Sequence, residues 1–150
     1  MKALIFAAGL GTRLKPLTDT MPKALVPING KPLLEHQILK MKKMGFDYLV
    51  INVHHFADQI IDFLSKNNNF GLKIDISDER NLLLETGGGV KKAASFFTDE
   101  KPFLIHNVDI LSNIDLQSFY TKNASKSLIS LLVNQRKTSR YLLFNEEKRL

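Results

Sequence analysis

Short apolar segments alternate with amphipathic segments along this chain, and this alternation is the feature that most restricts its fold. Apolar runs of five or six residues indicate buried β-strands. They lie at Ala3–Ala7, Tyr48–Val53, Leu72–Ile76, Phe103–Asn107 and Leu128–Val133, with a candidate sixth strand at Tyr141–Phe144. Strands separated by helices in this way predict an α/β fold with a mainly parallel central sheet.

Apolar side chains recur at helical spacing between the strands. Leu34, Ile38 and Met41 stand at positions i, i+4 and i+7, which predicts a helix that ends near Gly45. The other predicted helices carry Ala57, Ile60, Ile61 and Leu64, then Val90, Ala93, Ala94 and Phe97, then Leu116 and Tyr120 with Asp115 near the start. In such sheets ligands bind at the carboxyl ends of the strands, so the loops that follow the strands are expected to form one crevice.

The length and composition are those of one soluble domain, residues 1–150. The chain is 44% hydrophobic and 24% charged, and no apolar run approaches the roughly 20 residues that span a bilayer. The absence of cysteine excludes disulfides, thiolate zinc sites and a cysteine nucleophile. The start of the chain lacks the features of a signal peptide. We therefore expect a cytoplasmic protein with no membrane partner.

The net charge of +6 does not by itself indicate a nucleic-acid partner. The basic residues are scattered in small groups, at positions 40–43, 91–92 and 136–140. The first two groups fall on predicted helices, where lysines usually form a solvated face. We therefore expect no nucleic-acid partner, and we expect the excess positive charge to attract anionic substrates.

A glycine-bearing loop follows the first predicted strand. The segment Ala7–Pro27 reads AAGLGTRLKPLTDTMPKALVP and carries Arg13 and, ten residues later, Lys23. Backbone N–H groups, a guanidinium and an ammonium around one small volume suit the dense negative charge of a polyphosphate. Two common nucleotide motifs are absent, because Leu14 stands where the dinucleotide fingerprint needs a third glycine and no Gly-Lys-Ser/Thr sequence follows.

This segment resembles the signature of the nucleotidyltransferases that join a sugar 1-phosphate to a nucleoside triphosphate. The family pattern is Gly-x-Gly-Thr-Arg, followed by Pro-Lys and then by Lys-Pro. In this chain the pattern reads Gly9, Gly11, Thr12 and Arg13, then Pro22-Lys23, then Pro27 and Lys31-Pro32. The resemblance implies a Rossmann-like three-layer sandwich of the nucleotide-diphospho-sugar transferase type.

The resemblance also implies roles for the residues of this loop. Five consecutive residues would border the nucleotide, with glycine allowing its close approach: Ala8, Gly9, Leu10, Gly11 and Thr12. Arg13 would bind the triphosphate and stabilise the charge on the departing pyrophosphate. Lys23 would lie near the α-phosphate and the incoming sugar phosphate, where it reduces the repulsion between the two anions. Arg13, Lys23 and Asp109 are the expected catalytic residues.

A second glycine-rich segment, Leu84–Gly89, opens the third predicted helix. Three consecutive glycines at a helix start are unfavourable unless the backbone must approach something closely. The family has a glycine-rich turn here, and this version is most similar to that of the uridylyl- and guanylyltransferases, which implies that Gly87 and Gly88 contact the base. Glu85 is expected either to contact the base or a ribose hydroxyl, or to act only as a carboxylate at the helix N-terminus.

The segment His106-Asn107-Val108-Asp109 follows the fourth predicted strand. Family members place a magnesium-binding aspartate at this point, usually after a glycine, and Mg²⁺ prefers hard oxygen ligands. Asp109 is therefore the expected Mg²⁺ ligand, with a turn-capping aspartate as the alternative. Asn107 is the expected sugar contact. Val108 stands in place of the family's glycine.

The resemblance implies transfer of a nucleoside monophosphate from a nucleoside triphosphate to a sugar 1-phosphate, giving an NDP-sugar and pyrophosphate. UTP with an N-acetylmuramate-like sugar phosphate is the first expectation, and guanylyl transfer from GTP to mannose 1-phosphate is the second. Two alternatives stay open. One is a non-catalytic nucleotide-binding module. The other is a phosphocholine cytidylyltransferase, which is disfavoured because no Trp and only three Tyr are available for a cage around choline.

The resemblance covers only the front of the family domain. Family members continue beyond this length, and their later part supplies much of the sugar pocket and a second metal-binding aspartate. We therefore expect a chain that lacks the C-terminal sugar-binding part and is weakly active or inactive alone. An open sheet edge near Tyr141–Phe144 would favour a homo-oligomer, because an unpaired edge can pair with another strand.

Overall fold

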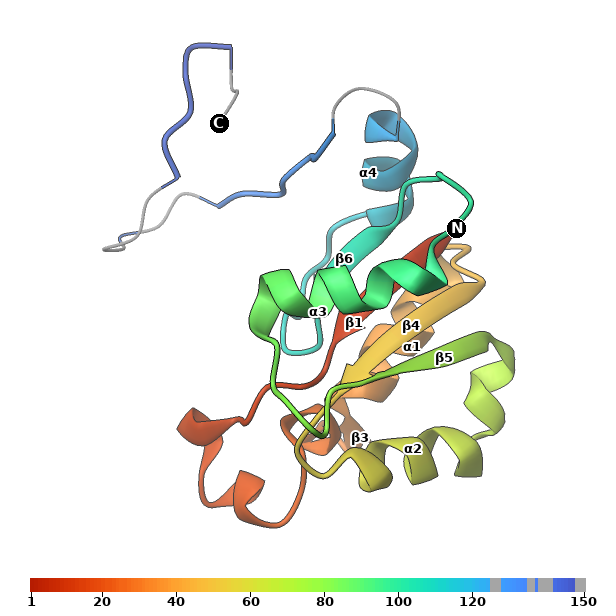
Figure 1. Ribbon diagram of the computed structural model, residues 1–150, viewed down its shortest axis with the longest axis vertical. Helices are drawn as coiled ribbons and strands as arrows, with labels where there is room; N and C mark the ends of the chain where they lie inside the picture. Colours follow the sequence, from red (N-terminus) through yellow and green to blue (C-terminus); the bar gives the residue numbers. More distant parts are fainter. Residues whose placement is uncertain (125–127, 135–136, 138–141, 148–150) are drawn as a thin grey trace.

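Four parallel strands form the central sheet (Figure 1). The computed structural model describes residues 1–124, 128–134, 137 and 142–147. The strands lie in the order β5-β4-β1-β6, with bounds β1 Lys2–Phe6, β4 Tyr48–Val53, β5 Lys73–Asp78 and β6 Leu104–Asn107. The predicted parallel α/β sheet is therefore confirmed for the first four predicted strands.

Helices cover both faces of this sheet, which gives three layers. In Figure 1, α3 (Glu85–Ala93) crosses the near face, and α1 (Leu33–Lys43) lies behind the sheet. Buried side chains of α2 (Ala57–Lys66) and α4 (Leu116–Asn123) belong to the same apolar cluster as those of α1. All four predicted helices are therefore confirmed. The remaining short elements are the antiparallel pair β2 (Pro27–Ile28) and β3 (Lys31–Pro32), and the 3₁₀ turns η1 (Thr12–Leu14), η2 (Leu17–Asp19), η3 (Lys23–Leu25), η4 (Asn68–Gly71) and η5 (Ala94–Phe96).

Alternate residues of each strand point to opposite faces of the sheet. In β1, Ala3 and Ile5 join the apolar cluster of α1 and α2, whereas Leu4 belongs to a separate cluster with Ala93 of α3. We call these two sides the α1 face and the α3 face. Both sides of the central strands are thus covered, which explains why their sequences read as continuous apolar runs.

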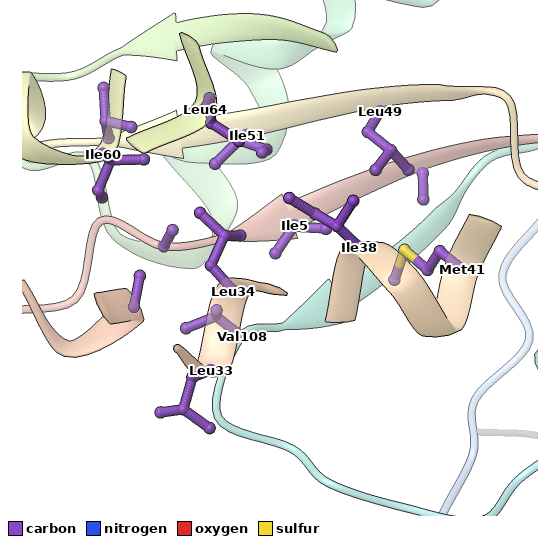
Figure 2. Packing of buried hydrophobic residues seen from close by; sticks show 14 of the residues in the cluster. Ile5, Leu33, Leu34, Ile38, Met41, Leu49, Ile51, Ile60, Leu64 and Val108 are labelled. Carbon is purple, nitrogen blue, oxygen red and sulfur yellow. The ribbon is translucent and has the colours of Figure 1, made fainter. Parts of the chain in front are cut away.

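The main hydrophobic core lies on the α1 face. Figure 2 shows side chains from α1 and α2 meeting those of the central strands, and Leu34, Ile38 and Met41 are fully buried, as the helical spacing predicts. Burial of an aliphatic side chain of this size contributes about 1.5–3 kcal/mol. This layer therefore supplies most of the hydrophobic stabilisation of the fold.

Local signals in the sequence mark where the helices begin and end. After α1 the chain turns at Gly45, whose φ of 81° lies in the left-handed region that glycine adopts without a steric penalty. Asp115 caps α4, because its carboxylate accepts a hydrogen bond from the Ser118 N–H at 2.9 Å. These residues explain why the predicted helix ends lie close to the observed ones.

The prediction of a strand at Leu128–Val133 is wrong. Residues 128–134 contain no strand, and the side chains of Leu128 and Ile129 are 99% and 72% exposed. In Figure 1 this blue segment runs away from the sheet. A strand needs a neighbour to pair its backbone groups, and none of the described strands pairs with this segment. Of the candidate sixth strand, Tyr141 lies outside the described residues and residues 142–144 contain no strand.

Two strands, β5 and β6, form the edges of the described sheet. The open edge expected near Tyr141–Phe144 is not formed by residues 142–144, because they are not in the sheet. Within the described part of the chain, no helix is long and apolar enough to cross a membrane.

Candidate functional site

A pocket of about 390 Å³ lies at the carboxyl ends of the strands, where the loops after β1, β5 and β6 meet. This is the edge at which parallel α/β sheets bind ligands. The pocket is lined by Phe6, Ala7, Ala8, Gly9, Arg13, Lys23, Asn52, Glu79, Leu83, Glu85, Thr86, Asn107, Val108 and Asp109. The expectation that these strand ends form one crevice is confirmed for the ends of β1 and β6 and for the segment before α3. His54 and His55, which follow β4, are not among the lining residues.

The loop after β1 owes its shape to Gly11. This residue has a φ of 66°, and a Cβ atom at its position would lie 2.8 Å from the Cγ2 atom of Thr18 and 3.0 Å from the Cβ atom of Lys23. The Thr18 hydroxyl also donates a hydrogen bond of 2.9 Å to the Gly11 carbonyl. Lys23 can therefore approach this closely only because residue 11 is glycine. The approach places the aliphatic part of the Lys23 side chain beside the loop.

Asn52 holds the first part of the same loop from behind. Its Oδ1 atom accepts hydrogen bonds from the N–H groups of Ala7 at 2.7 Å and Ala8 at 3.2 Å. These two amides are thus engaged within the protein. A ligand must reach the loop further along, and Gly9 offers this access because no atom lies within 4 Å of where its Cβ would stand.

Two cations, Arg13 and Lys23, stand on the walls of the pocket together with the Asp109 carboxylate, and Glu79 and Glu85 also line it. The Lys23 ammonium forms an ion pair with the Asp109 carboxylate, although the two residues are 86 positions apart in the sequence. Arg13 lines the same pocket from the exposed turn η1. The arrangement combines two positive side chains with backbone approach at Gly9, which suits a ligand with several phosphate groups.

Helix α1 anchors the loop that carries Asp109. The Gln37 side chain donates a hydrogen bond of 2.7 Å to the Ile110 carbonyl, and the Lys40 ammonium donates to the Ser112 carbonyl at 2.7 Å. Partial burial lowers the pKa of Lys40. The loop directly after Asp109 is therefore fixed to the core layer, and this fixes where the carboxylate stands.

The start of α3 forms another wall of the pocket. Glu85 and Thr86 line it, whereas Gly87 and Gly88 do not. Gly88 is needed for local packing, because a Cβ atom there would lie 2.9 Å from the Cβ atom of Leu84. Glu85 has a φ of 54°, a left-handed conformation that is uncommon for a residue with a side chain.

The structure brings together seven of the residues that the sequence singled out. They are Ala8, Gly9, Arg13, Lys23, Glu85, Asn107 and Asp109. The other five, Leu10, Gly11, Thr12, Gly87 and Gly88, lie in the same two loops but do not line the pocket. The side chain of Val108 packs in the core on the α1 face, and its N–H donates to the Phe6 carbonyl at 3.1 Å. The valine that replaces the family's glycine therefore fits here.

Sequence reasoning missed the two buried polar residues of the pocket, Asn52 and Glu79, and the exposed Thr86. The first two are almost fully buried, and Asn52 donates a hydrogen bond of 2.9 Å from its Nδ2 atom to the Oε1 atom of Glu79. A signal was present for Asn52, because it interrupts the otherwise apolar run of β4. Buried polar side chains need partners, so an asparagine inside a buried strand indicates a hydrogen-bond network.

Comparison with known proteins shows the family to which the chain is related. The sequence profile of the nucleotidyl transferase family matches residues 2–142. The chain is 40% identical over 125 residues to N-acetylmuramate alpha-1-phosphate uridylyltransferase of Neisseria meningitidis, covering 83% of this chain and 54% of that protein. It is 44% identical over 109 residues to the protein of the same name from Caulobacter vibrioides, covering 71% and 45%.

A solved structure shows the same fold. HddC from Yersinia pseudotuberculosis, complexed with GMP-PN, superimposes with a TM-score of 0.73 at 33% sequence identity, covering 83% of this chain and 54% of that one. The predicted fold of the nucleotide-diphospho-sugar transferase type is therefore confirmed. The chain spans about half the length of the curated relatives it matches.

Proposed function

This chain belongs to the nucleotidyl transferase family, and we propose that it binds a nucleoside triphosphate whose nucleoside monophosphate is transferred to a sugar 1-phosphate. The single observation that carries the proposal is the meeting of Arg13, Lys23 and Asp109 at one pocket bordered by two glycine-rich segments. Arg13 and Lys23 come from the loop after β1 and Asp109 from the loop after β6, and their joint presence suits a polyphosphate and its counter-cation.

In the proposed reaction, a phosphate oxygen of the sugar 1-phosphate attacks the α-phosphorus of the nucleotide. A new P–O bond forms, the bond from the α-phosphorus to the bridging oxygen breaks, and pyrophosphate leaves with the electron pair. The protein contributes positioning and charge stabilisation rather than covalent chemistry. Arg13 binds the triphosphate and stabilises the leaving pyrophosphate, and Lys23 reduces the repulsion between the two reacting anions. Asn107 is proposed to contact the sugar.

Magnesium fits the Asp109 carboxylate of the pocket. Asp109 is exposed, and it supplies the hard oxygen that Mg²⁺ prefers. The described residues contain no group of three or more acidic, His or Cys side chains that could hold a metal alone. Mg²⁺ usually takes only one or two carboxylates and completes its shell with phosphates and water. Asp109 would hold the ion, which would neutralise phosphate charge when bound.

The names of the relatives support a choice of substrates. Two of them are named for uridylyl transfer to N-acetylmuramate 1-phosphate, so we propose UTP and an N-acetylmuramate-like sugar phosphate for this chain. Gly87 and Gly88, with Glu85, are proposed to contact the base, and residues Ala8–Thr12 to border the nucleotide. The cytoplasm is the proposed location.

Calorimetric titration of the purified chain tests the nucleotide site. UTP, GTP, CTP and ATP are titrated in the presence of Mg²⁺ into wild type and Arg13→Ala. We expect UTP to bind most tightly and the variant to lose about tenfold or more in affinity, because a charge-assisted contact to phosphate is removed. Lys15→Ala is the matched control, since Lys15 lies in the same loop, pairs with Asp19 and does not line the pocket. Preference for ATP, or equal losses in both variants, would contradict the proposal.

Guanylyl transfer to mannose 1-phosphate is the second candidate. The guanylyl part is favoured by the structural relative from Yersinia pseudotuberculosis, which was solved in complex with GMP-PN. The mannose part is favoured by a relative from Danio rerio, 33% identical over 134 residues, that is named mannose-1-phosphate guanylyltransferase catalytic subunit beta. Tighter binding of GTP than of UTP in the same titration would select this candidate.

A binding role without turnover is the third candidate, because the chain spans only about half the length of its curated relatives. Release of pyrophosphate is the measurement that separates binding from transfer. The nucleotide that binds best is supplied with its sugar 1-phosphate and Mg²⁺. Pyrophosphate above the level of a Lys23→Ala control indicates transfer by this chain, and nucleotide binding without pyrophosphate indicates a binding module.

A further inference from the structure

A buried pair of polar side chains joins two walls of the pocket. Asn52, at the carboxyl end of β4, is 2% exposed, and Glu79, directly after β5, is 1% exposed. Both line the pocket, and the Nδ2 atom of Asn52 donates to the Oε1 atom of Glu79 at 2.9 Å. The pair therefore lies between the sheet and the ligand space.

Each member of the pair holds the backbone of one glycine-rich segment. The Oδ1 atom of Asn52 accepts from the N–H groups of Ala7 and Ala8, at the start of the loop after β1. The Oε2 atom of Glu79 accepts from the N–H of Leu84 at 3.2 Å, directly before α3. One chain of hydrogen bonds thus runs from the loop after β1, through Asn52 and Glu79, to the glycine-rich segment Leu84–Gly89.

Gly89 allows α3 to close over the pair. A Cβ atom at this position would lie 3.0 Å from the Oε1 atom of Glu79, 3.3 Å from the Nδ2 atom of Asn52 and 2.9 Å from the Cε1 atom of Phe6. The third glycine of the segment is therefore explained by packing on Asn52 and Glu79 and not by contact with a ligand.

Burial of the polar side chains of Asn52 and Glu79 costs more free energy than burial of apolar side chains in the same space. None of the ion pairs among the described residues involves Glu79, so its carboxylate is compensated only by hydrogen bonds. Apolar side chains of similar volume would usually fill such a space at equal or lower free-energy cost. A buried polar network of this kind holds its backbone partners in one arrangement when every group is satisfied.

We propose that Asn52 and Glu79 are positioning residues that set the separation of the two pocket walls and thereby determine nucleotide affinity. This inference rests on the proposed function, since it assumes that the nucleotide lies between these walls. Neither residue is required to contact the reacting atoms. Their effect acts through the backbone at Ala7, Ala8 and Leu84.

A reversal of polarity tests the pair. In Asn52→Asp two carboxylates face each other, and in Glu79→Gln the new NH₂ group must face either the Asn52 NH₂ group or the Leu84 N–H, both of which are donors. In the double variant N52D/E79Q the new amide donates to the new carboxylate, while its carbonyl oxygen accepts from Leu84. The formal charge of the pair is unchanged, and every hydrogen bond can re-form.

We expect the Kd of each single variant for UTP, or for GTP if wild type prefers it, to be about tenfold or more above that of wild type. The Kd of the double variant should lie within about threefold of the wild-type value, because the two residues are coupled neighbours in a double-mutant cycle. Titrations are made well below the melting temperature of each variant. A purely structural role would lower the melting temperature and the bound stoichiometry while the Kd of the folded fraction stayed at the wild-type value. That result, or a double variant no better than the weaker single variant, would overturn the inference.

Hydrogen exchange in wild type gives a second measurement that needs no substitution. Nucleotide binding is expected to slow exchange at the amides of Ala7, Ala8 and Leu84 together, because one network holds all three. Exchange at Leu84 that stays unchanged while Ala7 and Ala8 slow would contradict a shared network. Failure of wild type to bind any nucleotide would instead reject the proposed function, and the inference with it.

Discussion

The two faces of the sheet differ in the size of the buried apolar cluster that covers each of them. On the α1 face, 19 of the described residues form one buried apolar cluster with contributions from α1, α2 and α4. On the α3 face only three of the residues that the structure describes, Leu4, Val50 and Ala93, are buried in a cluster, and the side chains around them are partly exposed. The same strands contribute to both faces, so the difference comes from what covers each side.

The α3 face has few buried apolar side chains near the strand ends, where the site needs space and polar groups. Residues of β4, β5 and β6 that point to this side near the strand ends are Asn52, Ser77 and Asn107. The helix above them is rich in glycine and contributes one buried apolar side chain, Ala93, to the small cluster. Ile105 of β6, on the same side, is 44% exposed. We infer that the α1 face supplies stability and the α3 face supplies binding.

The largest expected effect is on the free energy of unfolding, when the same substitution, leucine to alanine, is made on each of the two faces. Leu34→Ala should destabilise the protein by about 4–5 kcal/mol, near the upper end for such changes. The neighbouring side chains are held in the core and cannot move inward to fill the cavity that the substitution leaves. Leu4→Ala should cost about 2–3 kcal/mol, because the partly exposed aromatic side chains around it can move inward. Urea unfolding followed by circular dichroism measures both losses. Equal losses would contradict the contrast between the faces.

An added methyl group at Gly89 should have an intermediate effect on stability and a clear effect on binding. Gly89→Ala places a Cβ atom against Phe6, Glu79 and Asn52, and overpacking of this kind costs about 1–3 kcal/mol. Nucleotide affinity should fall with it, because α3 must move away from the buried pair. Thermal unfolding and calorimetric titration give the two readouts.

Gly87→Ala is the matched comparison for Gly89→Ala. Nothing lies within 4 Å of its Cβ position, and the residue is inside a helix. Stability should therefore rise by about 1 kcal/mol through helix propensity. Nucleotide affinity should nevertheless fall, because the backbone at Gly87 is proposed to approach the base. A stabilised variant with unchanged affinity would remove Gly87 from the proposed site.

The smallest expected effect is a pH dependence on the α1 face. Burial lowers the pKa of His106 below its ordinary value of 6.5. Between the lowered pKa and 6.5 the unfolded chain binds more protons than the folded one, so stability rises with pH. The free energy of unfolding should accordingly fall as the pH drops below about 6.5. His106→Gln should reduce this fall, whereas His55→Gln, at an exposed position, should leave it in place.

The sequence predicted local structure best where one residue acts on the backbone around it. Gly11 and Gly45 adopt positive φ values at a loop and after a helix, and Asp115 caps α4, as such residues do in any fold. Arg13, Lys23 and Asp109 could be selected because they stand at matched positions of a family motif at strand ends. The structure brings all three to the pocket.

Prediction failed where a structure depends on a partner elsewhere in the chain. The apolar run Leu128–Val133 has the composition of a strand, yet it is not a strand, because composition cannot supply the neighbouring backbone that a strand requires. Glu79 gave no signal, because it stands between Asp78 and Arg80 in a charged run, and its burial depends on contacts with β4 and α3.

By itself, the sequence determined the order of strands and helices, the parallel arrangement and the loops that carry the site. These depend on periodicity, on caps and on glycine conformation, all of which act over a few residues. Only the tertiary structure decided that Lys23 meets Asp109 across 86 positions and that Asn52 and Glu79 join the two glycine-rich segments. Contacts of this kind depend on which strands become neighbours in the sheet, and that depends on the packing of the whole chain rather than on any local segment.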